Sequence, residues 1–341
     1  MTVYPWHRAA WQTLLARKSG LPHALLIRGR EGIGKRAFAR SLAQSLACLT
    51  PAADGAACGT CQSCRWFHAG VHPDYREVIP ESLQVEEGLA ALSADKKPSE
   101  RILIEAVRGL QDFVNLTSHH PHGKTITFYP AESLQPNAAN ALLKTLEEPP
   151  ASTRFVLVCH RPSYLPATII SRCQLLDLAV PAREVAIGWL RENGIAEAEL
   201  ALAQSGDAPL VALRLASEEN WTQRKEALNS LAVSPFEPLA VAEQMRDHAP
   251  ARLLGWLQRW SYDLLMTKLA GRVRYNPDFS TALARLATGL ATRDIVRFLR
   301  LVVAWQRIAN HPLNPRLFIE HMLLTYAALL RGESGEMRNA G

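Results

Sequence analysis

The sequence predicts an α/β domain with a parallel sheet, followed by all-α domains. The first half alternates short apolar runs with amphipathic stretches, the pattern of a parallel sheet covered by helices on both faces. Runs of the strand type end near Val180-Pro181, and helical patterns fill the remainder. At 341 residues the chain exceeds the roughly 250 residues of a single core, so two or three domains are expected.

Four apolar runs in the first half are predicted strands, because each is short and bounded by turn residues. They lie at 24–27, 124–129, 154–159 and 175–178. Pro136 opens a helix that Pro149-Pro150 ends, since proline fits the first helical turn and cannot continue a helix. The mixed stretch 81–100 is expected to be a loop or a weakly ordered insert.

The second half is predicted to be wholly helical. Gly206-Asp207-Ala208-Pro209 separates short Ala/Leu/Glu helices from the longer ones that follow. Apolar residues recur at helical spacing from Leu253 onward, and Asn314-Pro315 marks another helix start. We expect an α/β domain over 1–165, a small helical domain over 166–209, a third helical domain over 210–331, and a flexible tail at 332–341.

Composition excludes several classes of protein. With 48% hydrophobic and 21% charged residues, the chain is able to bury real cores. No apolar run reaches the ~18 residues of a membrane span, and the first residues lack the pattern of a signal peptide, so a cytoplasmic location is expected. The net charge of +6 is scattered along the chain, which permits nucleic-acid proximity without specifying it.

A glycine-rich loop follows the first predicted strand. Gly29, Gly32, Gly34 and Lys35 match the G-x-x-x-x-G-K part of a phosphate-binding loop. Such glycines let backbone N–H groups surround phosphate oxygens, and the lysine reaches the outer phosphates. The last position normally holds Mg²⁺ through a hydroxyl, but Arg36 has no lone pair to offer a metal. The segment is either a vestigial phosphate loop with weak or no binding, or a turn without a ligand.

The acidic residues of a working ATPase are also missing. The predicted strand 124–129 should end in carboxylates that hold Mg²⁺ and activate water. Tyr129 and Pro130 stand there instead, and Glu132 comes two residues later, where it would need a different backbone path. Because two separate features of Mg²⁺ chemistry are missing, we predict that this chain does not hydrolyse Mg²⁺-bound ATP.

Four of the six cysteines lie close together, at Cys48, Cys58, Cys61 and Cys64. In a reducing compartment such a cluster indicates a metal site before it indicates disulfides. Two-residue gaps let successive thiolates face one tetrahedral zinc ion, and four protein ligands leave no open position, so a structural zinc is expected. The alternative makes Cys48 a buried helix cysteine and lets His68 complete a weaker site, or leaves no site at all.

Two further motifs resemble the clamp-loader family of the AAA+ proteins. Residues 140–150 read NALLKTLEEPP and are followed downstream by Ser171-Arg172-Cys173, a pair that is very specific for the family. Tyr4-Pro5-Trp6 and the GVHPD segment at 70–74 add to the resemblance. It covers the whole chain and is strongest through Cys173.

The resemblance implies an architecture and a set of partners. Clamp-loader proteins join an AAA+ α/β domain to a helical lid and to a helical collar that assembles a ring, which would make 166–209 the lid and 210–331 the collar. The implied partners are the gamma/tau motor subunits, the clamp-opening delta subunit and, through the complex, the sliding clamp and primed DNA. The chain would be a non-catalytic component of the DNA polymerase III holoenzyme. The resemblance also favours Cys48 as the fourth zinc ligand.

Arg172 is the site residue that the resemblance singles out. In the family, the arginine of this motif crosses a subunit boundary and reaches the ATP of a neighbouring motor subunit. A guanidinium is permanently charged and forks onto phosphate oxygens as the γ-phosphoryl group leaves. From the residues alone, Arg172 is equally an arginine that bonds the last carbonyls of a helix.

The hypothesis is therefore a non-motor, stator-like subunit that supplies Arg172 in trans. Two alternatives stay open on the sequence. One is an active clamp-loader ATPase motor in which Glu132 and a water replace the missing ligands. The other is a sequence-independent DNA-binding module, which rests only on the net charge of +6.

Overall fold

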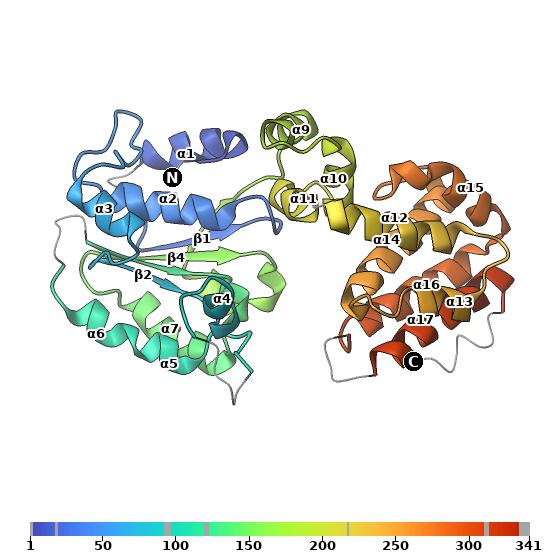
Figure 1. The fold of residues 1–341 in the computed structure, drawn as a ribbon. Helices are drawn as coiled ribbons and strands as arrows, with labels where there is room; N and C mark the ends of the chain where they lie inside the picture. Colours follow the sequence, from blue (N-terminus) through green and yellow to red (C-terminus); the bar gives the residue numbers. More distant parts are fainter. Residues whose placement is uncertain are drawn as a thin grey trace. The chain divides into compact units, whose positions relative to one another are not determined.

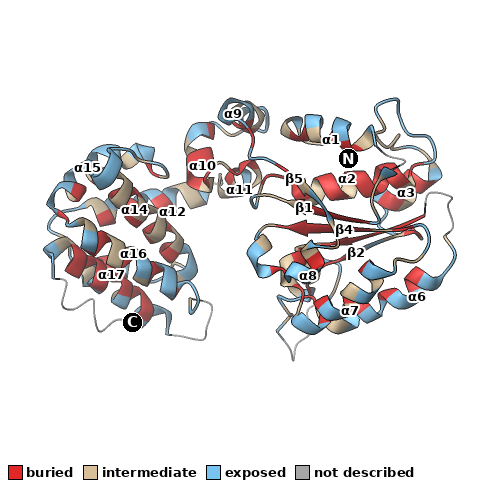
Figure 2. Ribbon diagram, turned by 180° about the vertical axis from the view of Figure 1, so that it is seen from behind, coloured by how far each residue is buried: buried red, intermediate tan, exposed pale blue. Residues whose placement is uncertain are grey.

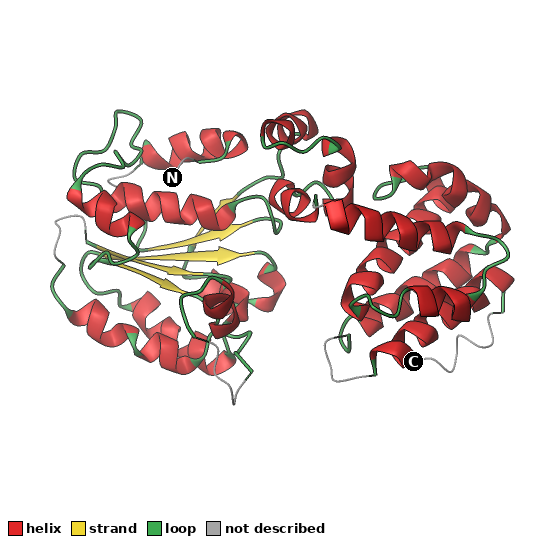
Figure 3. Ribbon diagram, in the orientation of Figure 1, coloured by secondary structure: helices red, strands yellow, loops and turns green. Residues whose placement is uncertain are grey.

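The computed structural model describes residues 3–17, 20–91, 97–118, 123–216, 218–309 and 314–333. The chain forms two compact units, Met1–Val185 and Ala186–Gly341 (Figure 1). All strands among the described residues belong to the first unit, and the second is helical (Figure 3). The predicted fold class is confirmed.

A five-stranded sheet forms the centre of the first unit, and every pairing in it is parallel. Its strands are β1 (Ala24–Arg28), β2 (Tyr75–Val78), β3 (Lys124–Phe128), β4 (Thr153–Cys159) and β5 (Gln174–Asp177). The order is β2-β3-β4-β1-β5, so β1 lies between β4 and β5. The loop after β1 therefore leaves the sheet at the carboxyl edge, where β3 and β4 also end.

Helices cover both faces of the sheet, and the central strands are buried (Figure 2). Because side chains alternate along a strand, Leu25 and Ile27 pack with one helical layer while Ala24 and Leu26 pack with the other. The helices are α1 (Arg8–Leu15), α2 (Lys35–Ala47), α3 (Gln62–His68), α4 (Glu81–Glu86), α5 (Ile104–Arg108), α6 (Leu110–Asn115), α7 (Pro136–Glu147) and α8 (Ala167–Ile170), with 3-10 turns η1 (Pro5–His7), η3 (Ala131–Ser133) and η4 (Pro162–Tyr164). In Figure 1, α1 and α2 lie on one face and α5 to α7 on the other.

The four predicted strands are present within one residue of their expected ends. The sequence analysis missed β2, because its four residues are mostly partly exposed and include Arg76 and Glu77. Within 81–100, the expectation of a loop is wrong for Glu81–Glu86, which forms α4. Strand β5 pairs with β1, so the sheet runs past position 165. The division into a lid and a collar at 209 stays a prediction, and the expected tail at 332–341 lies outside the described residues from 334 onward.

The second unit is built from helices that surround two hydrophobic cores. The small core lies among the first three helices, and the large core lies among the others. The helices are α9 (Arg183–Glu192), α10 (Ala198–Ser205), α11 (Pro209–Leu215), α12 (Glu218–Ala232), α13 (Pro238–Gln244), α14 (Pro250–Ala270), α15 (Ser280–Gly289), α16 (Thr292–Trp305) and α17 (Pro315–Arg331), with the turn η5 (Pro277–Phe279). The predicted start of α17 is confirmed, because the Asn314 side chain accepts from the backbone N–H groups of Arg316 and Leu317.

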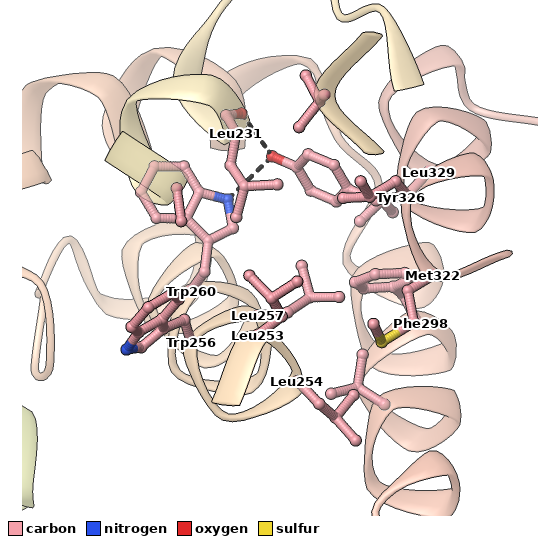
Figure 4. Close-up of a cluster of buried hydrophobic side chains, with 14 of the residues drawn as sticks. Leu231, Leu253, Leu254, Trp256, Leu257, Trp260, Phe298, Met322, Tyr326 and Leu329 are labelled. Atoms are coloured by element: carbon pink, nitrogen blue, oxygen red, sulfur yellow. Dashed lines mark hydrogen bonds between the residues drawn. The ribbon is translucent and has the colours of Figure 1, made fainter. Parts of the chain in front are cut away.

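Two buried aromatic residues connect three helices of the large core (Figure 4). The indole N–H of Trp260 donates to the Tyr326 hydroxyl at 2.9 Å, and that hydroxyl donates to the Leu231 carbonyl at 3.1 Å. Both rings are fully buried. Burial without these partners would cost free energy, so the two bonds hold α12, α14 and α17 in one arrangement.

A buried polar network joins the small helices to the large ones. Gln204 of α10 donates to the side-chain oxygen of Asn276 at 2.8 Å, and Asn276 in turn donates to Asp263 of α14 at 2.8 Å. Arg224 of α12 makes two bonds to Asp278, at 2.7 and 2.8 Å. Because Gln204, Asn276, Asp263 and Arg224 are nearly inaccessible to water, breaking the network would leave unpaired buried groups. Among the described residues, no helix is long and apolar enough to span a membrane.

Candidate functional site

The loop predicted to bind phosphate lies between β1 and α2, as expected. Gly32 and Gly34 have positive φ angles of 76° and 95°, which L side chains rarely adopt. Gly34 immediately precedes α2, which begins at Lys35. A Cβ at Gly34 would lie 2.4 Å from the Tyr4 ring, so glycine is also required there for space.

Lys35 is turned back onto its own loop. Its Nζ donates to the Arg30 carbonyl at 2.5 Å, and the side chain is 2% exposed. Burial lowers the pKa of Lys35 to about 8, so the ammonium group stays mostly protonated at neutral pH. The group that would reach a nucleotide phosphate is instead satisfied within the loop.

The N-terminal segment packs on this loop. Trp6 donates from its indole N–H to the Ile33 carbonyl at 2.8 Å and stacks on Tyr4 with ring centroids 4.9 Å apart. His7 is buried edge-on against Phe38 of α2. Burial, together with the nearby charge of Lys35, lowers the pKa of His7 to about 4. These contacts fix the loop through residues far from it in the sequence.

Arg36 is held by two carboxylates. Its guanidinium bonds Glu77 at 2.9 and 3.0 Å and also pairs with Glu87, while Tyr129 lies beneath it with the ring centroid 4.8 Å away. The Arg36 and Glu77 side chains are 17% and 12% exposed. The position that holds Mg²⁺ in a working loop thus carries a cation with its own counter-ions, which repels a second cation.

Glu132 is committed to a structural role. Its carboxylate accepts hydrogen bonds from the backbone N–H groups of His160, at 3.0 and 3.2 Å, and of Arg161, at 3.1 Å. These residues directly follow β4, which lies between β1 and β3 in the sheet. Glu132 therefore caps the end of a strand, and no local sequence pattern indicates these partners, which lie 28 and 29 residues away.

The four cysteines predicted to bind metal come together around the end of α2 and the start of α3. Their Sγ atoms all lie within 4.8 Å of one another, and the Cys48–Cys61 and Cys58–Cys64 pairs are 4.0 Å apart. Four thiolates about 2.3 Å from a tetrahedral zinc would stand roughly 3.8 Å apart, so the donor set fits that ion.

Hydrogen bonds favour the thiolate form of Cys58, whereas burial raises the pKa of Cys48 and raises that of Cys64 to about 12. The Thr50 hydroxyl and nearby backbone N–H groups lower the pKa of Cys58 to about 5. The backbone N–H groups of Cys58 and Cys61 donate to the sulfurs of Cys48 and Cys58, each at 3.3 Å. His68, the alternative ligand, instead forms a hydrogen bond with Gln44 at 3.1 Å. Among the described residues, the group of side chains placed to hold a metal here consists of the four cysteine sulfurs.

Arg172 directly follows α8 and is partly exposed. It donates to the Thr168 carbonyl at 2.9 Å and pairs with Glu147, at the end of α7, at 2.5 Å. The bond to Thr168 is the helix-terminal contact expected for a purely structural arginine. The exposed fractions of the Arg172 and Glu147 side chains are 34% and 51%, so water competes for both groups.

The fold and the loop define the class of protein. A parallel sheet of order β2-β3-β4-β1-β5, with a phosphate-type loop after β1 and a helical C-terminal unit, is an AAA+ P-loop architecture. In this chain the elements that would hold Mg²⁺ are replaced by ion pairs and caps.

The chain belongs to the DNA polymerase III delta' subunit family. It matches the families described as "DNA polymerase III, delta subunit" over residues 8–182 and "DNA polymerase III, delta subunit, C terminal" over 218–327. It is 37% identical to DNA polymerase III subunit delta' of Pseudomonas aeruginosa over 78% of each chain. It is 33% identical to the delta' subunit of Escherichia coli K12 over 95% of each chain.

A tau subunit of DNA polymerase III matches a smaller part of the chain. DNA polymerase III subunit tau of Salmonella typhimurium is 35% identical over 151 residues, which are 44% of this chain and 21% of that protein. Because a delta' subunit matches 95% of the chain and the tau subunit matches 44%, the comparisons favour the non-motor hypothesis over the motor alternative.

Proposed function

We propose that this chain is the non-motor, stator-like subunit of a clamp loader of DNA polymerase III, and that it supplies Arg172 to a neighbouring ATPase site. Its partners would be the gamma/tau motor subunits and the clamp-opening delta subunit. The assembled complex would load the sliding clamp onto primed DNA with energy from ATP hydrolysed by the motors. The kinship with delta' subunits over nearly the whole chain supports this role.

The observation that carries the proposal is the state of Arg36. A guanidinium paired with Glu77 and Glu87 stands where a hydroxyl would bind Mg²⁺. Tyr129 packs on it from the end of β3, where a catalytic carboxylate is required. The chain therefore keeps the P-loop fold as a scaffold and leaves hydrolysis to its neighbours.

Arg172 has the properties that an arginine acting in trans requires. It is partly exposed, and its ion pair with Glu147 is of the solvent-accessible kind that contributes about 0–1 kcal/mol. A phosphate of a bound nucleotide carries more charge than one carboxylate and accepts the same two parallel hydrogen bonds from a guanidinium. Exchanging Glu147 for a neighbour's γ-phosphate would thus be favourable on assembly.

A reconstitution experiment tests this role. The complex is assembled from the partner subunits with either wild-type chain or Arg172→Ala, and DNA-stimulated ATP turnover is measured. An arginine finger contributes about 10³–10⁵ in kcat at the site it serves, so the mutant complex should lose the turnover of that site. Arg172→Lys should recover little, because lysine lacks the planar fork.

The control is Arg108→Ala, an exposed arginine at the end of α5 in the same unit. It should leave turnover unchanged. Equal turnover with Arg172→Ala and Arg108→Ala, in complexes of equal subunit composition, would refute the trans role while leaving membership of the complex intact.

The buried network of the second unit supports a stator-like role. A stator must transmit force without bending, and rigidity between helices comes from packed, fully bonded contacts. Gln204, Asn276 and Asp263 form such a chain from α10 to α14. Arg274 and Asp207 add an ion pair at 3.6 Å between the same regions.

We also propose a structural zinc ion at Cys48, Cys58, Cys61 and Cys64. The ion would join the end of α2 to α3 and has no open position for catalysis. Metal analysis of the purified protein should give one zinc per chain, and Cys61→Ser should lose it. A zinc-free wild-type protein with four titratable thiols would contradict the proposal.

Nucleotide binding at the vestigial loop of Gly29, Gly32, Gly34 and Lys35 is expected to be weak or absent. Lys35 already bonds the Arg30 carbonyl, so a phosphate would have to displace that contact. Equilibrium binding of labelled ATP with and without Mg²⁺ measures this directly. Tight binding that depends on Mg²⁺, together with hydrolysis abolished by Lys35→Ala, would instead favour the motor alternative.

A further inference from the structure

A pocket lined with arginines lies in the second unit, far along the chain from the loop and from Arg172. Its volume is about 370 Å³, within the range of pockets that hold small ligands. It is formed by the end of α11, the beginning of α12 and the first half of α14. Its lining comprises Arg214, Leu215, Glu219, Asn220, Ala251, Arg252, Gly255, Trp256 and Arg259.

Three guanidinium groups contribute to this pocket, and none of them pairs with a described carboxylate. Arg252 donates to the side-chain oxygen of Gln223 at 2.6 Å, and Arg259 donates to the Gly255 carbonyl at 3.2 Å. Arg214 is exposed and has no hydrogen bond to a described residue. Two other arginines of this unit, Arg224 and Arg316, do pair with carboxylates, those of Asp278 and Glu320.

The positive charge of Arg259 is partly buried and has no described carboxylate beside it. Burial lowers the pKa of this guanidinium, the interaction with Tyr275 raises it in part, and the charge of Arg224 lowers it further. An anion in the pocket would counteract the lowering, because an opposite charge at close range favours the ionised form.

The acidic residue of the pocket does not neutralise it. Glu219 accepts from the side-chain N–H of Gln223 at 2.9 Å, and Gln223 stands between Glu219 and Arg252. The lining therefore keeps an excess of positive charge. Ala251 and Arg252 also belong to the first turn of α14, where the helix dipole is positive.

We propose that this pocket binds a phosphate group, carried either by a nucleic-acid strand or by a free phosphate compound. Several guanidiniums around one cavity suit the tetrahedral set of oxygens on a phosphate, which accepts more charged hydrogen bonds than a single carboxylate. Gly255 adds no side chain at the wall, so the cavity stays open. The site is distinct from the P-loop and from the arginine that acts in trans.

The test uses the full chain and a fluorescein-labelled single-stranded oligodeoxyribonucleotide, with binding followed by anisotropy at several salt concentrations. The pocket variant is Arg214→Gln with Arg252→Gln, two exposed positions where loss of the fold is not expected. The control variant is Arg272→Gln with Arg300→Gln, two exposed arginines outside the pocket. Both variants remove the same charge, and circular dichroism confirms that each is folded.

If the phosphate belongs to nucleic acid, the pocket variant should bind the oligonucleotide at least about tenfold more weakly than the control variant. Each phosphate contact on a single strand contributes about 0.7 to the slope of log K against log salt, so loss of two contacts should reduce that slope by about 1.4. If the source is a free phosphate compound, the wild type and the control variant should have a higher Tm in inorganic phosphate than in chloride of equal ionic strength. The Tm of the pocket variant should be the same in both solutions.

Either difference between the two variants supports the phosphate site, and comparison of the two arms identifies the source. Equal binding and equal phosphate response in both variants would overturn the proposal, because the effect would then be one of general charge. Polyglutamate that binds the wild type as tightly as the oligonucleotide at equal salt would also overturn it, in favour of an acidic protein partner.

Discussion

Removing the guanidinium of Arg36 should destabilise the first unit strongly without creating an ATPase. In Arg36→Met the side chain keeps its approximate length and loses its charge, which leaves Glu87 without its cation and Glu77 with only the more distant Arg40, at 3.9 Å. Breaking a buried pair from one side costs about 3–5 kcal/mol. Because Glu77 is 12% and Glu87 30% exposed, water recovers part of this, and a loss of about 2–4 kcal/mol in unfolding free energy is expected.

Urea unfolding followed by circular dichroism measures this loss. With a slope near 2 kcal/mol per molar urea, the midpoint for the first unit should fall by about 1–2 M. The matched control is Arg28→Met, which breaks a two-bonded pair with Asp177 whose side chains are 25% and 69% exposed. That surface pair should contribute only about 0–1 kcal/mol.

The effect should also depend on pH. Hydrogen bonding to Arg36 lowers the pKa of Glu87, so this part of the stability is present above the unfolded pKa and is lost as pH falls through the folded pKa. The gap between wild type and Arg36→Met should therefore narrow in acid. Equal midpoints for Arg36→Met and Arg28→Met at neutral pH would refute the view that the ion-pair cluster stabilises the loop.

Three further outcomes are expected. Tyr326→Phe should lower the unfolding free energy by about 1–3 kcal/mol in calorimetry, because the Trp260 indole loses its acceptor, and an unchanged Tm would contradict this. Gly123→Ala should cost more than Gly194→Ala, since both have positive φ but only at Gly123 would a Cβ meet a carbonyl oxygen, at 2.0 Å; similar urea midpoints would argue against that clash. His7 is buried in its neutral form with a pKa of about 4, so its contribution to the stability of the protein is complete above about pH 6.5 and is lost as pH falls toward 4. Between pH 7 and 5, the unfolding free energy of the wild type should therefore fall by about 1–2 kcal/mol more than that of His7→Phe, and parallel pH profiles would contradict this.

Local patterns predicted the fold where one segment carries the whole signal. Strands β1, β3 and β4 are apolar runs between turns, and α7 starts at Pro136 and ends before Pro149, so each was identified without knowledge of its neighbours. Strand β2 was not, because Tyr75–Val78 is short and half-exposed. It becomes a strand through its pairing with β3, which no local pattern records.

At the candidate site, too, local patterns indicated some features and contacts between distant segments decided others. The spacing of the cysteines indicated a metal cluster, but the choice between Cys48 and His68 depended on where α2 ends and α3 begins. The structure brings the Cys48 sulfur to 4.0 Å from that of Cys61 and places His68 against Gln44. Arg172 was identified by its motif alone, while its exchangeable pairing with Glu147 required the packing of α7 beside α8.

The sequence by itself determined which residue types stand at the metal-binding positions of this loop, and it predicts loss of Mg²⁺ chemistry because Arg36, Tyr129 and Pro130 are the wrong residue types for a metal. Only the tertiary structure decided which groups Arg36 contacts. Glu77 and Glu87 lie 41 and 51 residues beyond Arg36, and they meet it because β2 and the segment after α4 come to the same edge of the sheet. Residue type limits what chemistry is possible, whereas contacts between distant segments are set by how the whole chain packs.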